Sequence, residues 1–305
     1  MTATAISNLV MHKSLMDHMR ETRKNVARTQ EQISSGRAVE TYEELASTGR
    51  TEGIINMESK LSQINSYLDN NQIITGRLQA TDTSLENIIN SLFEFRSVLV
   101  KRRSALGSSP EIVTTINQVG KTTLSIMRDN LNLRYDGQYM FAGAKVDVQP
   151  VNNIVDQTNI LNGEVTSNYY NGDGVTRSTK VSDSLTVNYG VRANEAGFQK
   201  AIGAINLTLK AVDDNNLSDA YELLDDAIKD IVNVRNNVRN SMSQIENVSE
   251  IFESTRVYFT QSIGEVINTN IPEASVTLAN DMARLMGTYQ TFSQVSRLNL
   301  MDYLK

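Results

Sequence analysis

Apolar residues recur at a spacing of seven through the second half of the chain. The series starts at Leu217, and every later member is apolar: Leu224, Ile231, Val238, Ile245, Phe252, Phe259 and Val266. A second series, four residues further on, is weaker because it includes Arg235 and Arg256. A heptad pattern sustained this long predicts one continuous helix with a coiled-coil seam, about 75 Å in length at about 1.5 Å per residue. Ser218 and Asp219 fit an N-cap and an acidic first turn.

The same alternation of three and four residues occurs in the first half. It predicts a helix from roughly residue 50 to 106, on the positions Leu85, Ile88, Leu92, Phe95 and Leu99. Ser109 and Pro110 then fit the N-cap and first position of a second helix. That helix follows Ile112, Ile116, Val119, Thr123, Ile126, Asn130 and Leu133. A further helical stretch carries Phe198, Ile202, Ile205, Leu209 and Val212.

Residues 137 to 197 have a different pattern. A run from Leu185 to Val191 alternates apolar and polar residues, as a half-buried strand does. The run YYNGDG, Tyr169 to Gly174, contains two turn dipeptides. We therefore expect a small β-rich insert of two or three hairpins. Its entry is YDGQYMFAGAKVDVQPV, where five residues are candidates for the joint between helices and insert: Gly137, Tyr139, Phe141, Gly143 and Pro150.

Both ends of the chain carry narrow, interrupted apolar stripes. The N-terminal stripe consists of Met19, Val26 and Ile33, with Leu9 and Met16 on a neighbouring line. The C-terminal stripe consists of Leu278, Met282, Leu285, Tyr289 and Phe292, and it shifts register to Val295 and Leu298. Arg23, Gln30 and Ser296 interrupt these stripes, so neither helix should be stable alone. The two stripes are candidate assembly surfaces, which contact each other or other copies of the chain.

Composition narrows the class of protein. The 305 residues include 6% aromatic residues, no Trp and 3 Pro, which favours an elongated, thin-cored protein over a compact enzyme. A net charge of −6 argues against a nucleic-acid partner, because phosphate binding draws on clustered Lys and Arg. The absence of cysteine excludes disulfides and thiolate chemistry. No segment is apolar enough for a membrane span, and the N-terminus lacks the apolar region of a cleaved signal peptide.

Candidate chemical sites are incomplete. Gly143 is followed by Ala144-Lys145-Val146, which does not satisfy a phosphate-binding loop. A calcium loop starting at Asn171 would place Ser182 where the closing acid is required. The only two histidines, His12 and His18, are six residues apart and so lie on different faces of a helix. Adjacent acids such as Asp225-Asp226 diverge on a helix. We expect no catalytic residues, no metal site and no cofactor.

These patterns predict a mainly α protein: an elongated long-helix bundle or coiled coil built from both chain termini, with a small β-rich insert in the middle. The expected divisions are an N-terminal assembly helix in residues 1–45, a helical rod in 46–136 and 198–268, the insert in 137–197, and a C-terminal assembly helix in 269–305.

Five segments together resemble one family. They are QEQISSGRAV (Gln30 to Val39), DGQYMFAGAKVDVQPV (Asp136 to Val151), YYNGDG, VRANEAGF (Val191 to Phe198) and SRLNLMDYL (Ser296 to Leu304). In this order they resemble the bacterial flagellar hook-filament junction proteins, the third hook-associated proteins, which are relatives of flagellin. The Ser-Gly-Arg segment is shared with flagellin, whereas the Tyr-x-Phe-Ala-Gly-x-Lys run and the Asp-Tyr-Leu ending are more specific to junction proteins.

The resemblance implies a non-enzymatic adaptor that assembles with itself into a ring or helical layer. Its implied partners are the first hook-associated protein, flagellin and an export chaperone, and its implied location is the extracellular flagellum, reached through the flagellar type III apparatus. The segment Glu40 to Glu44 departs from the family, which usually has an acid pair and a proline there. Two alternatives remain: a filament-forming flagellin, and a coiled-coil signalling or binding module.

Overall fold

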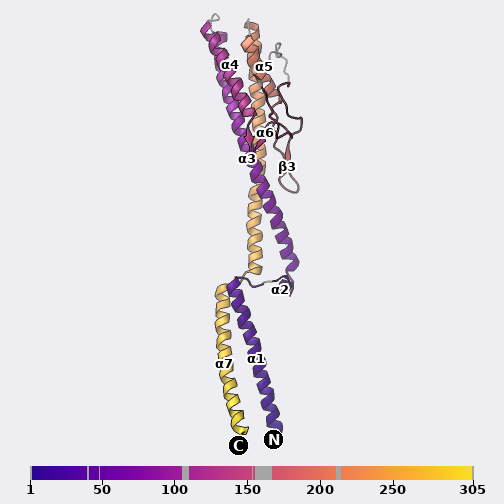
Figure 1. The fold of residues 1–305 in the computed structure, drawn as a ribbon, viewed down its shortest axis with the longest axis vertical. Helices are drawn as coiled ribbons and strands as arrows, with labels where there is room; N and C mark the ends of the chain where they lie inside the picture. Colours follow the sequence, from indigo (N-terminus) through magenta and orange to yellow (C-terminus); the bar gives the residue numbers. More distant parts are fainter. Residues whose placement is uncertain are drawn as a thin grey trace. The chain divides into compact units, whose positions relative to one another are not determined.

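The structure is a computed structural model that describes residues 2–39, 41–47, 49–104, 110–152, 154, 167–210 and 214–303, with side chains left undescribed at 2–9, 47, 103–104, 214–215 and 298–303. Its helices are α1 (Thr2–Ser35), α2 (Tyr42–Ser47), α3 (Thr51–Ser104), α4 (Pro110–Leu131), α5 (Ala196–Lys210), α6 (Asp214–Ile267) and α7 (Ile271–Tyr303). Short strands lie between α4 and α5 (Figure 1). The prediction of a mainly α fold with a small strand-containing insert is confirmed.

The predicted helix boundaries are close to the observed ones, with two differences. The sequence predicts one helix in residues 1–45, but α1 ends at Ser35, where Gly36 has a φ of 71°, and α2 follows as a separate helix. Pro110 is the first residue of α4, as expected, while Ser109 lies outside the described residues. The N-cap prediction at Ser218 is wrong, because α6 already begins at Asp214. Leu217 is buried in the core, so the chain gains apolar burial by starting the helix before that residue.

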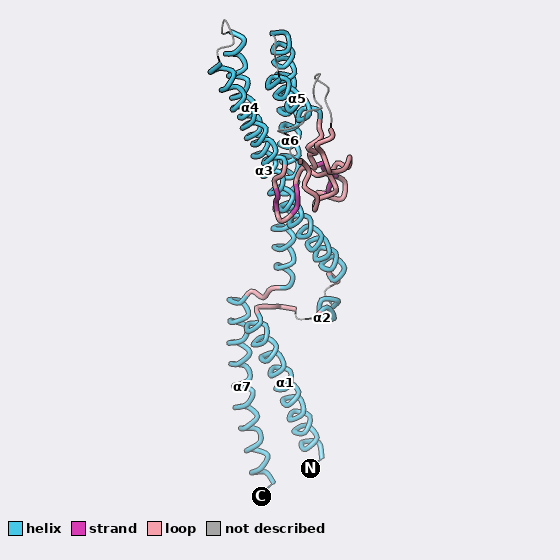
Figure 2. Tube along the Cα trace, turned by 45° about the horizontal axis from the view of Figure 1, so that its top comes forward, coloured by secondary structure: helices cyan, strands magenta, loops and turns pink. Residues whose placement is uncertain are grey.

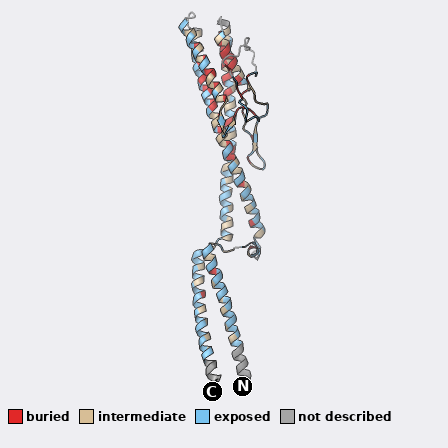
Figure 3. Ribbon diagram, in the orientation of Figure 1, coloured by how far each residue is buried: buried red, intermediate tan, exposed pale blue. Residues whose placement is uncertain are grey.

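The chain forms two compact units. We call Gln63–Ser254 the bundle unit, and we call Met1–Ser62 together with Thr255–Lys305 the terminal unit. Helices α3 and α6 each contribute residues to both units. Buried residues gather in the bundle unit, whereas α1 and α7 are mostly exposed (Figure 3).

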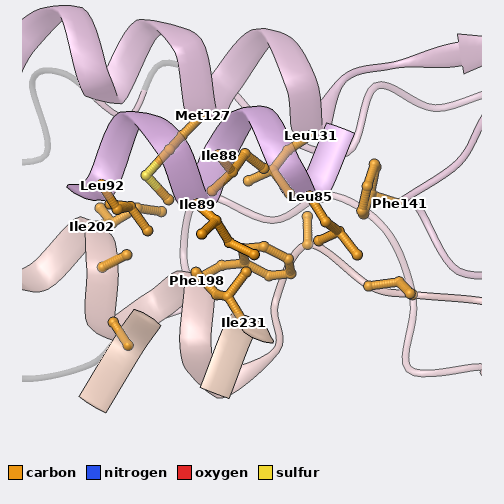
Figure 4. Close-up of a cluster of buried hydrophobic side chains, with 14 of the residues drawn as sticks. Leu85, Ile88, Ile89, Leu92, Met127, Leu131, Phe141, Phe198, Ile202 and Ile231 are labelled. Carbon is orange, nitrogen blue, oxygen red and sulfur yellow. The ribbon is translucent and has the colours of Figure 1, made fainter. Parts of the chain in front are cut away.

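The core of the bundle unit lies between α3, α4, α5 and the bundle part of α6. Figure 4 shows side chains from all four helices converging, among them Leu85, Met127, Phe198 and Ile231. The heptad positions predicted for α6 are buried from Leu224 to Ile245. Close packing depends on small residues at two crossings: Gly120 of α4 faces Phe95 and Ile205, and Gly197 of α5 faces Ile231. A methyl group at Gly197 would lie 2.8 Å from the Ile231 side chain.

A charged cluster also connects α3 to α6 in this unit. Asp82 accepts hydrogen bonds of 2.8 Å from Arg235 and 2.9 Å from Arg239, and Arg235 also pairs with Glu86 at 2.8 Å. Partial burial alone would raise the pKa of Asp82, but the two arginine hydrogen bonds outweigh it and lower that pKa. The cluster is therefore a satisfied ion network and contributes to stability at neutral pH.

The described residues between α4 and α5 contain two antiparallel hairpins and are drawn mostly as loop in Figure 2. The first hairpin begins at Arg134, three residues before the predicted start of the insert. The first pairs β1 (Arg134–Tyr135) with β2 (Gln138–Tyr139), and the second pairs β3 (Ser178–Lys180) with β4 (Thr186–Asn188). Asp136 and Gly137, with φ of 50° and 74°, form the two-residue loop of the first hairpin. Positive φ at both loop residues is the backbone of a type I′ turn, which matches strand twist.

The second hairpin lies against α3 through polar contacts. Gln63 and Tyr67 both donate to Asp183 Oδ1, at 2.7 and 2.9 Å, and Asn70 donates to Thr179 Oγ1 at 2.9 Å. The predicted alternation in this region is observed, since Val187 is buried between exposed neighbours. Hydrogen bonds to α3 and the buried side chains of Val181 and Val187, which belong to the bundle core, together hold this hairpin to the helices.

Candidate assembly surface

The described residues contain no group of three metal-ligating side chains, and no described helix is long and apolar enough to cross a membrane. His12 packs edge-on against the Phe292 ring, with centroids 5.2 Å apart, while His18 is exposed. Asp173 lies in the loop that starts at Asn171, whose spacing does not complete a calcium site. Its carboxylate accepts hydrogen bonds from the backbone N–H groups of Ala144 and Val175. The Ala144 bond is the largest cause that lowers the pKa of Asp173, so this carboxylate serves the loop's own backbone.

The largest contact of the terminal unit is the antiparallel packing of α1 against α7, which brings both chain ends to the same end of the pair (Figure 1). The less exposed positions of each helix recur at steps of three and four. On α1 they are His12, Leu15, Met19, Thr22, Val26, Thr29 and Ile33. On α7 they are Ala274, Leu278, Asp281, Leu285, Thr288, Phe292 and Val295. The pair is thus a short two-helix coiled coil.

The seam of this pair is unusually polar. Among its described side chains the two least exposed are polar, Thr29 at 8% and Asp281 at 9% exposure, and every apolar member is half-buried. Asp281 has Arg284 of its own helix 3.6 Å away. Burial of polar groups in place of leucine weakens a coiled-coil seam. One partner helix therefore leaves the apolar residues of α7 incompletely covered.

The predicted stripe on α7 is divided by this packing. Leu278, Leu285 and Phe292 lie in the seam, whereas Met282 and Tyr289 are 38% and 39% exposed. Met286, which the sequence analysis did not include, is 67% exposed and lies one turn from Met282, on the same side of the helix.

The N-terminal stripe is divided in the same way. Met19, Val26 and Ile33 are seam residues, while Met16 is 46% exposed. With seam residues at heptad positions a and d, Met16, Met282 and Tyr289 all take position e. In an antiparallel pair the e positions of both helices border the same side of the seam. We call Met16, Met282, Met286 and Tyr289 the edge strip. The side chains of Leu9 and Leu298 lie outside the described residues.

The segment after α1 (Gly36 to Ala38) and the segment before α7 (Ile267 to Thr269) are hydrogen-bonded to each other. Gly36 ends α1 with φ of 71°, a frequent C-terminal conformation for glycine. The Ala38 N–H then donates to the Ile267 carbonyl at 2.7 Å, and the Thr269 N–H donates to the Gly36 carbonyl at 2.9 Å. Asn270 caps α7 through the Glu273 N–H at 3.5 Å. The segment that follows α1 and the segment that precedes α7 are therefore fixed together.

The short helix α2 (Tyr42–Ser47) follows α1. Thr41 caps it through the Glu44 N–H at 3.2 Å, and Tyr42 donates its hydroxyl to Glu58 of α3 at 2.9 Å. This hydrogen bond is the main cause that raises the pKa of Tyr42. A cavity of about 150 Å³ lies beside it, lined by Arg37, Val39, Thr41, Tyr42, Leu45, Glu58 and Ile267. Tyr42 and Thr41 thus both make contacts within the terminal unit.

The predicted joint residues differ in burial and in the contacts that they make. Phe141 is fully buried, and its ring meets Phe198 of α5 edge-on at 6.3 Å. Tyr139 is half-buried, and the Cζ atom of the Arg134 guanidinium lies over its ring, 4.7 Å from the ring centroid. The Pro150 carbonyl accepts from the Asn171 N–H at 2.9 Å.

Gly143 and two neighbouring tyrosines complete the packing of the joint. Gly143, with φ of 71°, packs against Asp173. The buried Tyr169 donates to the Ala193 carbonyl at 2.8 Å, and burial raises its pKa. Burial also raises the pKa of Tyr170 to about 12. Both phenols therefore stay protonated as hydrogen-bond donors at neutral pH.

Comparison with known proteins gives a partial family match and a shared fold. Residues 6–146, a little under half of the chain, match the bacterial flagellin N-terminal helical region. No curated protein matches significantly. Among solved structures, a putative flagellar hook-associated protein from Vibrio parahaemolyticus aligns with a TM-score of 0.58 at 14% identity, over 70% of this chain and 96% of that one.

Two further solved structures share the fold. Bacillus cereus FlgL aligns with a TM-score of 0.54 at 17% identity, over 70% of this chain and 99% of that one. The flagellar hook associated protein-3 from Legionella pneumophila aligns with a TM-score of 0.54 at 16% identity, over 70% and 98%. Residues 6–146 are thus flagellin-like in sequence. The chain shares its fold with flagellar hook-associated proteins, over about 70% of its length.

Proposed function

We propose that this chain, flagellin-like at its N-terminal region and hook-associated in fold, is a non-enzymatic structural subunit that joins the flagellar hook to the filament. The proposal rests on one observation above all: α1 covers only part of the apolar surface of α7. The uncovered residues of α7, Met282, Met286 and Tyr289, form the edge strip together with Met16 of α1, on one side of the helix pair. Contiguous exposed apolar residues on a helix are a typical protein interaction surface.

The occupant of the edge strip is the helix pair of a neighbouring copy in a ring or helical layer. Head-to-tail contacts between unlike surfaces generate such a layer, whereas a self-complementary contact would close into a dimer. A layer of this kind would contact the first hook-associated protein on one side and flagellin on the other. The subunit would be exported unfolded through the flagellar type III apparatus, with α7 held beforehand by a cytoplasmic chaperone.

The first test is deletion of the gene in the source bacterium, with electron microscopy of the cells and analysis of the medium. We expect intact hooks, no filaments, and flagellin released into the medium. Filaments of normal length in the deletion strain would rule out the junction role.

A substitution tests the edge strip itself. Met286→Glu places a charge on an exposed helix position, so the isolated protein should keep its fold and stability within about 0.5 kcal/mol. In the deletion strain it should restore few or no filaments, because an uncompensated carboxylate would be buried between subunits. Ala283→Glu is the matched control, since it adds the same charge to an exposed position of α7 on the face turned away from α1. Equal filament counts for the two variants would contradict the assignment.

A filament-forming flagellin is the second candidate, because the matched region in residues 6–146 is that of flagellin. Seeding the purified protein at high salt separates the two. Growth into long filaments without other components would favour flagellin and exclude the junction role.

A further inference from the structure

Sulfur is distributed unevenly between the two units. The chain has no cysteine and 11 methionines, so methionine thioethers are its only sulfur groups. Three of them, Met16, Met282 and Met286, lie exposed in the edge strip, while Met127 and Met140 of the bundle unit are buried at 0% and 6% exposure. Oxidation of methionine follows exposure, so oxidants should reach the edge strip well before the core.

The chemistry of the thioether matters at this surface. A methionine side chain is apolar and adaptable, which suits a contact between subunits. Its sulfoxide is polar and carries a strong hydrogen-bond acceptor. The neighbours of each methionine in the strip are other methionines, which have no donor, and Tyr289, whose single hydroxyl could serve at most one sulfoxide oxygen. Burying a polar group without a partner disfavours association.

We propose that Met16, Met282 and Met286 form a reversible oxidation site that controls assembly of the subunit. The oxidant class is a peroxide. The thioether sulfur attacks one peroxide oxygen, the O–O bond breaks, an S–O bond forms, and the second oxygen leaves as water after protonation. Sulfur loses two electrons and the peroxide gains them. The inference rests on the proposed function, because it needs the edge strip to be buried between subunits.

The fold should survive this modification. The three methionines lie beside the α1–α7 seam rather than in it, and their side chains already contact solvent. Met19 is the methionine within the described seam, and it is half-buried. Oxidation restricted to the edge strip therefore changes the surface of the helix pair and leaves its core contacts in place.

The first experiment measures where oxidation occurs. The purified full chain is treated with hydrogen peroxide, and sulfoxide at each methionine is followed by peptide mass spectrometry. We expect Met286 to react roughly tenfold faster than Met127, with Met16 and Met282 between them. Equal rates at exposed and buried methionines would overturn the proposal.

The second experiment measures assembly. Salt-induced self-association of the purified chain is followed by light scattering before and after peroxide. The oxidised protein should require at least about tenfold more protein to associate, and methionine sulfoxide reductases of both stereospecificities should restore it. The triple variant M16L/M282L/M286L keeps an apolar strip without thioethers and should associate equally before and after peroxide.

Met11→Leu is the matched control for the triple variant. Met11 is also exposed, at 49%, but it takes heptad position g on the other side of the seam. This variant should stay as sensitive to peroxide as the unaltered chain. Two outcomes would overturn the redox inference and leave the proposed assembly surface standing. In one, the triple variant remains sensitive to peroxide; in the other, the oxidised chain associates as well as the untreated chain. Failure of the untreated chain to associate overturns the proposed assembly surface and the inference with it.

Discussion

The bundle unit and the terminal unit are built from helices with the same heptad spacing, yet they bury very different amounts of apolar surface. In the bundle unit four helices and the insert contribute to one core, and Leu85, Phe95 and Phe198 are fully buried. In the terminal unit α1 and α7 pack mainly against each other, and no described apolar side chain of either helix is fully buried. Heptad spacing thus fixes which face of a helix is apolar, while the number of neighbours fixes how much of that face is covered.

The difference follows from the seam residues as well as from the neighbours. The bundle core is mostly aliphatic and aromatic, although it also buries polar residues such as Thr123 and Asn206. In the α1–α7 seam, by contrast, four of the fourteen positions are Thr22, Thr29, Asp281 and Thr288. Polar groups in a seam reduce its stability and leave the pair able to gain further contacts from another chain. We therefore expect the terminal unit to open at a lower free energy than the bundle unit.

The largest expected effect compares two phenylalanines. Phe198→Ala removes a fully buried ring and should destabilise the bundle unit by about 4 kcal/mol. Phe292→Ala removes a half-buried ring from the seam and should cost about 1 kcal/mol. Hydrogen–deuterium exchange with mass spectrometry measures the opening free energy of each unit separately. Similar losses for the two substitutions would show that the α1–α7 pair is packed as tightly as the bundle.

Two glycines sharpen the comparison. A methyl group at Gly197 would lie 3.0 Å from the Ile231 backbone nitrogen, so Gly197→Ala should destabilise the bundle unit by about 2 kcal/mol. At Gly287 of α7 a methyl group meets nothing within 4 Å, and Gly287→Ala should stabilise the helix by about 0.8 kcal/mol. Urea unfolding followed by circular dichroism gives both values. A stable Gly197→Ala protein would mean that α5 and α6 can move apart without loss.

A smaller effect depends on pH. Because the folded pKa of Asp82 is lowered, its contribution to stability is present above the unfolded value of about 3.9 and is lost as pH falls through the folded value. Asp82→Asn should therefore reduce the unfolding free energy by about 2 kcal/mol at pH 7, and the deficit should shrink below pH 4. Asp129→Asn is the control, since Asp129 is exposed and its arginine partner is the adjacent Arg128. A deficit that stays constant from pH 7 to pH 2 would exclude the ion network as its cause.

Much of the helical architecture could be predicted because it depends on local spacing. The heptad series that begins at Leu217 predicted α6, and Pro110 marked the first residue of α4. The Asp136-Gly137 turn depends on glycine's access to positive φ, so the sequence at that point already favours a hairpin. The contacts of the insert were not predictable, because Asp183 meets Gln63 and Tyr67 across more than 100 residues.

The candidate site could be predicted only in part. The sequence pointed to Met16, Met282 and Tyr289 together with Leu278, Leu285 and Phe292, because all of them share one apolar arc on their helices. Met286 was missed, since it lies at the edge of that arc and outside the three-four alternation. Spacing of four from Met282 was the signal that could have found it. The roles of the termini in assembly remain predictions that the filament and association experiments test.

Sequence by itself determined the helices, their apolar faces and the interruption by a β-rich insert, because these follow from residue spacing and backbone preference. Tertiary structure decided which half of each terminal stripe is covered. That choice depends on where α1 lies around α7, which is set by the contacts of both helices at once, including the hydrogen bonds between Gly36–Ala38 and Ile267–Thr269. No pattern within a single helix contains that information, since the apolar arc is wider than one partner can cover.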